Sequence, residues 1–195
     1  MTPPLVLAVD GGNSKTDLAL VRASGEVLAL VRGPQSSPYH LGVDGCLQVL
    51  DDLLARAMRE AGLPNGRRPV ADIGELLLAG VDFPIEEEEV HTAAAERRLA
   101  ARITVGNDTF AVLRAGTEKG WGVAVVCGHG INCIGVGVAG VTGCCVIGPA
   151  MVDSLWPGSG ISGSLDEDCA LLSTFARPAG NTDCSHCARI RFDYA

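Results

Sequence analysis

A short run of glycine, hydroxyl and charged residues near the amino terminus has the composition of a phosphate-binding loop. It reads Asp10-Gly-Gly-Asn-Ser-Lys-Thr16 and lies between two apolar segments of strand length. Small residues let backbone N–H groups and hydroxyls approach a polyphosphate closely, and Asp10 could hold Mg²⁺ directly or through water. The loop is not a Walker A motif, because that motif precedes a helix and separates its two glycines. A plain hairpin turn is the alternative interpretation.

Two further segments place polar groups beside apolar runs. Gly106-Asn-Asp-Thr109 puts Asp108 where a strand is expected to give way to a helix, and Val126-Cys-Gly-His-Gly-Ile-Asn-Cys133 is a second glycine-rich turn. An acid at such a junction is a candidate functional residue. The alternative is that Asp108 only caps the helix that follows.

These motifs need strands to hold them, and the hydrophobic pattern predicts such strands. Between short glycine-containing turns, the first 33 residues contain three apolar runs that suit a meander. The strands expected along the chain are Leu5–Asp10, Asp17–Ala23, Val27–Arg32, Glu75–Val81 and Arg102–Gly106, followed by a hairpin of Trp121–Cys127 with Cys133–Val138.

Three helices are expected between these strands. Apolar residues recur at helical spacing from Leu47 to Ala61, with Asp44 as a candidate cap and Gly62 as the stop. Four glutamates at 86–89 open a second helix that runs to about Ala100, and Thr109–Ala115 is the third. The order βββαβαβα predicts an α/β fold with a mixed sheet flanked by helices.

Composition excludes several classes of protein. The formal net charge is −8 over 195 residues, which argues against a nucleic-acid-binding surface, since that needs clustered Lys and Arg. The amino terminus lacks the basic segment of a signal peptide, so a cytoplasmic protein with reduced cysteines is expected. The uncharged stretch Gly120–Val152 is rich in glycine, which favours buried strands and turns over a membrane span.

Taken together, the motifs resemble the amino-terminal lobe of the acetate and sugar kinase/Hsp70/actin superfamily. Within it, the sequence is most similar to the N-acetylglucosamine kinase-like BadF/BadG/BcrA/BcrD ATPase family. The resemblance covers about residues 5–138 and rests on Val9-Asp-Gly-Gly-Asn-Ser-Lys-Thr-Asp17, Gly80-Val-Asp-Phe-Pro84, Asn107-Asp108 and the segment Gly120–Cys133. It implies a ribonuclease H-like lobe of the actin-like ATPase fold, with a mixed five-stranded sheet.

The resemblance also implies a role for each motif. Asp10 would lie near Mg²⁺, and Asp108 would contact the sugar as the general base. The residues implied to bind the ATP phosphates are Gly11, Gly12, Ser14, Lys15, Thr16, Gly128, His129 and Gly130. Those implied to bind the sugar are Ser37, Asn107, Asp108, Ile131 and Asn132. Two positions depart from the family pattern: Ser37 stands in place of a longer asparagine, and His129 stands where threonine is usual.

The implied activity is transfer of the ATP γ-phosphate to a hydroxyl of an amino sugar, with N-acetylglucosamine as the expected substrate and ATP and Mg²⁺ as cofactors. The partners would be these small molecules, without nucleic acid or membrane, and a homodimer that buries the exposed lobe interface is compatible with this assignment. Two alternatives are a sugar-binding lobe without catalysis and an activator-type ATPase of the same family.

The carboxyl-terminal part of the sequence does not continue the family pattern. We expect residues 1–138 to form the ATPase/kinase lobe and residues 139–195 to form an atypical tail that replaces the second lobe. Lys15 and Lys119 are the only lysines among 15 basic residues, which suggests a GC-rich genome and a frameshift near residues 137–145. Cys184-x-x-Cys187 in the tail is a single pair, whereas a zinc signature needs two.

Overall fold

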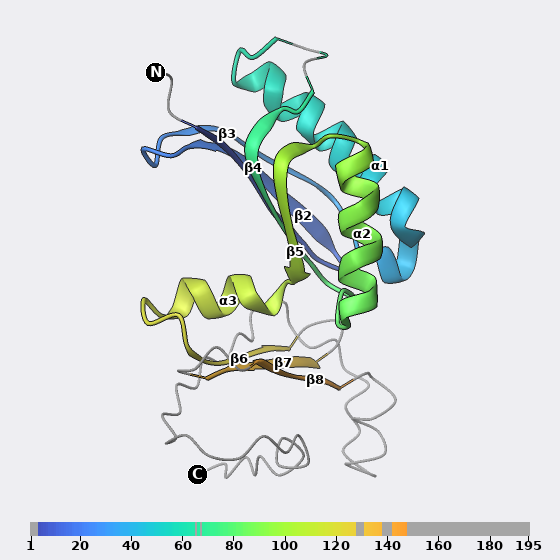
Figure 1. Cartoon of the computed structure of the whole chain (residues 1–195), viewed down its shortest axis with the longest axis vertical. Coiled ribbons are helices and arrows are strands. Elements are labelled where there is room, and N and C mark those ends of the chain that lie inside the picture. Colours follow the sequence, from blue (N-terminus) through green and yellow to red (C-terminus); the bar gives the residue numbers. More distant parts are fainter. Residues whose placement is uncertain (1–3, 65, 67, 128–130, 138–141, 148–195) are drawn as a thin grey trace. The chain divides into compact units, whose positions relative to one another are not determined.

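A five-stranded mixed sheet organises the amino-terminal part of the computed structural model (Figure 1). The structure describes residues 4–64, 66, 68–127, 131–137 and 142–147. The chain divides into two units, residues 1–111 and residues 112–195. The predicted motifs around Asp10 and Asp108 both belong to the first unit.

The strands of this sheet follow the order β3-β2-β1-β4-β5. The first three pair antiparallel as a meander, whereas β4 and β5 run parallel to β1. Parallel neighbours need crossover connections, which helices between β3 and β5 supply. The predicted mixed five-stranded sheet is confirmed. Its strands are β1 Leu5–Gly11, β2 Lys15–Arg22, β3 Val27–Pro34, β4 Ala71–Leu78 and β5 Ala100–Asn107.

The fourth strand begins and ends earlier than the predicted Glu75–Val81. Its pairing with β1 starts at Ile73, and the chain leaves the sheet where the Ala79 N–H donates to the Gly11 carbonyl at 2.7 Å. Gly80 then has φ +76°, a left-handed conformation that glycine adopts without penalty. The apolar run continues through this turn to Val81, which is buried outside the strand, so the pattern alone misplaced the strand end.

Two helices lie on one face of the sheet, α1 (Pro38–Glu60) and α2 (Pro84–Glu96), and they contact each other (Figure 1). Helix α1 begins before the predicted position, so Asp44 is not its N-cap. Gly42 breaks the helical geometry with φ 69°, and the longer part of the helix follows it. The Asp44 carboxylate instead accepts a hydrogen bond from Arg97 at 2.9 Å. Gly62 ends the helix as predicted, with φ +66°.

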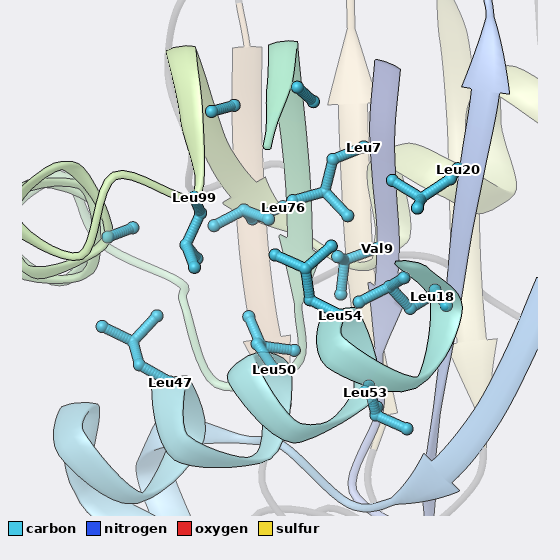
Figure 2. Close-up of a cluster of buried hydrophobic side chains, with 14 of the residues drawn as sticks. Leu7, Val9, Leu18, Leu20, Leu47, Leu50, Leu53, Leu54, Leu76 and Leu99 are labelled. Carbon is cyan, nitrogen blue, oxygen red and sulfur yellow. The ribbon is translucent and has the colours of Figure 1, made fainter. Parts of the chain in front are cut away.

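The core of the first unit lies between α1 and the sheet (Figure 2). Leucines at helical spacing on α1, among them Leu47, Leu50 and Leu54, face alternate residues of the central strands. Leu18, Leu20 and other sheet residues of this face are fully buried, as alternation along a half-covered strand requires. This packing fixes the sheet whose ends carry the predicted motifs.

The second unit contains a three-stranded antiparallel sheet in the order β6-β7-β8. The predicted hairpin is present as β6 (Gly122–Cys127) and β7 (Ile131–Val136). A third strand, β8 (Thr142–Ile147), pairs with β7 inside the segment that sequence analysis assigned to the tail. The candidate cysteines of the tail lie outside the described residues.

Helix α3 (Thr109–Gly116) begins directly after β5, close to the predicted bounds. No helix in the described part of the chain is long and apolar enough to cross a membrane. Cys46 is a buried thiol.

Candidate active site

Three carboxylates lie at the carboxyl ends of the parallel strands of the first unit. Asp10 belongs to the end of β1, while Asp82 and Asp108 follow β4 and β5. The strand register explains their proximity, because Gly11 pairs with Leu78 and Leu78 pairs with Asn107. In sheets of this kind, ligands bind outside the carboxyl ends of the strands.

Burial and the neighbouring carboxylates both act on Asp108. Its pKa is raised to about 6, with desolvation by burial as the largest cause and the negative charges of Asp10 and Asp82 adding to it. Hydrogen bonds from backbone N–H groups act in the opposite direction. A carboxyl with a pKa near neutrality is suited to proton transfer, because its protonated and ionised forms are then close in free energy.

The residue before this carboxyl, Asn107, is only 2% exposed. Its Nδ2 donates to Oδ1 of Asp82 at 2.7 Å, and its Oδ1 accepts the Thr109 N–H at 2.9 Å and also the Thr109 hydroxyl. The side-chain carbonyl of Asn107 therefore caps the first turn of α3. The resemblance implied a sugar contact for this residue, whereas the structure places its amide in internal hydrogen bonds.

The turn after β4 is held by a glutamate of α2. The Glu86 carboxylate accepts the backbone N–H groups of Asp82 and Phe83 at 2.7 and 2.9 Å. A carboxylate at this position also stabilises the positive end of the helix dipole. The turn that carries Asp82 is thus fixed on its backbone side.

The predicted phosphate loop connects β1 to β2 as a tight hairpin. Gly12 N–H donates to the Lys15 carbonyl at 2.9 Å, and Gly11 pairs with Thr16. A Cβ at Gly11 would lie 2.4 Å from Leu78 Cδ2 and 2.5 Å from a serine hydroxyl, so close packing also requires glycine there. Ser14 and Lys15 are exposed. Desolvation and the charge of Asp17 raise the pKa of Asp10, and the charge of Lys15 offsets part of this rise.

Thr16, at the end of this loop, is fully buried. Its hydroxyl lies 2.7 Å from the Pro34 carbonyl and 2.7 Å from the Ser36 hydroxyl. Since a hydroxyl carries one proton, Thr16 donates to the carbonyl and accepts from Ser36. Thr16 thus fastens the loop to the segment after β3.

The next residue, Ser37, is also fully buried, and its hydroxyl has no hydrogen-bond partner within the described chain. It lies against the turn after β4, because a Cβ at Gly80 would be 2.9 Å from Ser37 Oγ. A buried polar atom without a partner is costly, which makes this hydroxyl a candidate contact for a polar ligand.

The remaining predicted residues belong to the second unit. Gly128, His129 and Gly130 lie outside the described residues. Ile131 and Asn132 begin strand β7, where they pair with Cys127 and Val126. The structure therefore brings Asp10, Asp108 and the first glycine loop together, and sequence reasoning assigned no role to Asp82. The Gly80-Val-Asp-Phe-Pro84 segment was the available signal, since it carried an acid at a strand end.

Comparison with known proteins supports the predicted relationship. The chain is 26% identical over 150 residues to the N-acetyl-D-glucosamine kinase of Dictyostelium discoideum, an alignment that covers 73% of this chain and 47% of that protein. The chain is homologous to N-acetylglucosamine kinase. It spans about half the length of this curated relative. No protein-family model matches the sequence.

Solved structures agree on the fold. A Chromobacterium violaceum protein provisionally assigned as an N-acetylglucosamine kinase matches with a TM-score of 0.59 and 24% identity, over 73% of this chain and 48% of that chain. A protein of the same assignment from Porphyromonas gingivalis matches with a TM-score of 0.53 and 20% identity, over 66% of this chain and 43% of that chain. The resemblance to the amino-terminal lobe of N-acetylglucosamine kinase-like proteins is therefore confirmed.

The raised pKa of Asp108 predicts a pH-dependent stability. Because the folded-state pKa of about 6 exceeds the unfolded value of 3.8, the folded state binds the proton more tightly. The contribution of Asp108 to stability should then be greatest below about pH 4, fall as the pH rises towards 6, and stay constant above that. Asp108→Asn should remove this dependence and stabilise the protein at pH 7 by on the order of 1–3 kcal/mol.

Urea unfolding followed by circular dichroism at pH 4 to 7.5 measures this effect. The expected result is a difference between Asp108→Asn and the unmodified chain that grows from pH 4 to pH 6. A difference that does not vary with pH would contradict the raised pKa.

Proposed function

We propose that this chain is the nucleotide- and sugar-binding lobe of an ATP-dependent kinase that phosphorylates an amino sugar, with N-acetylglucosamine as the substrate. The observation that carries the proposal is the Asp108 carboxyl, with its pKa raised to about 6, held beside Asp10 at the carboxyl ends of parallel strands. Homology to a kinase of that name supports the substrate class. ADP and a sugar phosphate would be the products.

Phosphoryl transfer asks the protein mainly to position the reactants and to neutralise charge. Asp108 would accept the proton of the attacking sugar hydroxyl as that oxygen bonds to the γ-phosphorus and the bond to the ADP oxygen breaks. The exposed Lys15 and Ser14 would contact the phosphates, and Gly11 and Gly12 would let the chain approach them. The buried Ser37 hydroxyl would gain its missing hydrogen bond from the sugar.

The residues of the first unit also fit a magnesium ion. Mg²⁺ commonly binds through one or two carboxylates, with water and substrate phosphates completing its coordination. The described residues contain no cluster of three metal-ligating side chains, so a cage made of protein alone is not formed there. Asp10 would supply the carboxylate, and a cation there would offset the desolvation and the repulsion from Asp17 that raise its pKa. When bound, Mg²⁺ supplies charge neutralisation at the transferring phosphate.

ADP release by the 195-residue chain tests the proposal. The chain is incubated with Mg-ATP in the presence and absence of N-acetylglucosamine, with glucose as a matched sugar lacking the acetamide, and the sugar product is weighed by mass spectrometry. We expect ADP and a phosphorylated sugar only when N-acetylglucosamine is present.

Other results of this assay would favour one of the two alternative functions. ADP release independent of sugar would indicate an ATPase of the activator type. Calorimetric sugar binding without ADP release would indicate a non-catalytic sugar-binding lobe. Absence of both turnover and binding would contradict the proposal.

A further inference from the structure

A chain of hydrogen bonds connects the turn after β4 to the start of α3. It begins at the Asp82 carboxylate, which accepts from Nδ2 of Asn107 at 2.7 Å. It continues from Oδ1 of Asn107, which accepts the Thr109 N–H at 2.9 Å. Asp108 lies between the two residues that these hydrogen bonds hold, and its own carboxylate also accepts a backbone hydrogen bond from Thr109.

The donors and acceptors in this series of hydrogen bonds fix the orientation of the Asn107 amide. An ionised carboxylate only accepts hydrogen bonds, so Asp82 selects the NH₂ end of the Asn107 amide. The carbonyl end must then face Thr109, where it caps α3. Without the carboxylate, the buried NH₂ group would lose its partner, and either amide orientation would leave one buried group unsatisfied.

The backbone of Asp82 is held by Glu86. The Asp82 N–H donates to Glu86 Oε2 at 2.7 Å, as does the neighbouring Phe83 N–H at 2.9 Å. A fixed carboxylate can impose a geometry on Asn107, whereas a mobile one could not. The connection thus runs from the first turn of α2, across the end of β4, to the first turn of α3.

We propose that Asp82 is a positioning residue for Asp108, acting through the Asn107 amide to hold the turn on which the general base stands. The catalytic effect of Asp82 rests on the proposed function of Asp108. The effect of Asp82 on the position of the turn does not depend on that function. Asp82 need not touch the sugar or the phosphates in this role.

Two variants of Asp82 separate positioning from other roles. Asp82→Ala removes the acceptor, while Asp82→Asn keeps a carbonyl oxygen that can accept from Asn107 and removes only the charge. Asp72→Ala is the matched control, because Asp72 lies on β4, the strand that precedes the Asp82 turn, and its carboxylate also accepts one N–H hydrogen bond, from the Leu5 backbone at 2.7 Å.

The first measurement is amide hydrogen exchange at Thr109, read by NMR on the full chain. We expect exchange at least 10-fold faster in Asp82→Ala, near the unmodified rate in Asp82→Asn, and unchanged in Asp72→Ala. Equal exchange in Asp82→Ala and Asp72→Ala would overturn the positioning role, whether or not the chain turns over ATP.

The second measurement is steady-state kinetics of ADP release. A misplaced catalytic group can cost about 100-fold in rate, so we expect kcat of Asp82→Ala to fall by about 10–100-fold with little change in KM for ATP. Asp82→Asn should restore kcat to within about threefold of the unmodified chain. A loss in Asp82→Asn as large as in Asp82→Ala would contradict the proposal, while absence of turnover in the unmodified chain would count against the proposed function alone.

Discussion

Asp108→Asn is expected to lower the kcat of sugar-dependent ADP formation by about 10²–10⁴-fold, the range that a positioned general base contributes. The amide is nearly isosteric with the carboxyl but cannot accept a proton from the sugar hydroxyl. Because the charged carboxyl is disfavoured where it lies, the inactive variant should be folded and at least as stable as the unmodified chain at pH 7. Initial rates at saturating Mg-ATP and sugar, with unfolding curves for both proteins, measure the two effects.

The control is the same chemical change at an exposed site. Asp52 lies on α1, where its carboxylate accepts from Gln48 at 3.2 Å, away from the strand ends that carry the site. Asp52→Asn should retain the full rate. If Asp108→Asn kept more than a third of the rate, the proton acceptor would have to be another group, and the assignment of Asp108 would fail.

Leu54→Ala is expected to destabilise the first unit by about 2–5 kcal/mol, the usual cost of removing a buried leucine side chain. Leu54 is 1% exposed and lies between α1 and the sheet, among the leucines drawn in Figure 2. The cost has two parts, the lost transfer of apolar surface from water and the cavity left behind, because close-packed neighbours relax only partly.

Leu41→Ala is the matched variant, since Leu41 belongs to the same helix but is 37% exposed. We expect it to cost less than about 1 kcal/mol. Both tryptophans, Trp121 and Trp156, lie beyond the first unit, so amide hydrogen exchange in β1 is the better probe than fluorescence. Equal costs for the two variants would show that the core does not lie where α1 meets the sheet.

The amino-acid sequence determined the order of strands and helices in the first unit. Apolar runs between glycine-containing turns defined β1 to β3, and a leucine stripe at helical spacing defined most of α1. Such patterns are local, so they can be read without knowledge of the fold. The start of α1 was missed for a local reason as well, because Gly42 interrupts the helix between Pro38 and the leucine stripe.

The sequence also pointed to the residues with chemistry, but not to all their partners. Asp10, Asp108 and the first glycine loop stand out by type and by position at strand ends. Asp82 stands at the end of another apolar run, and nothing in the run shows that it meets Asn107, 25 residues further along. That meeting depends on β4 and β5 lying side by side in parallel.

Only the tertiary structure decided what the buried polar groups do. The Asn107 amide and the Thr16 hydroxyl form hydrogen bonds within the chain. The Ser37 hydroxyl, which is also buried, has no hydrogen-bond partner among the described residues. A residue type states which bonds a side chain can make, and only its surroundings state which bonds it has made. The pKa of Asp108 is decided in the same way, because desolvation and neighbouring charges arise when distant strands are brought together.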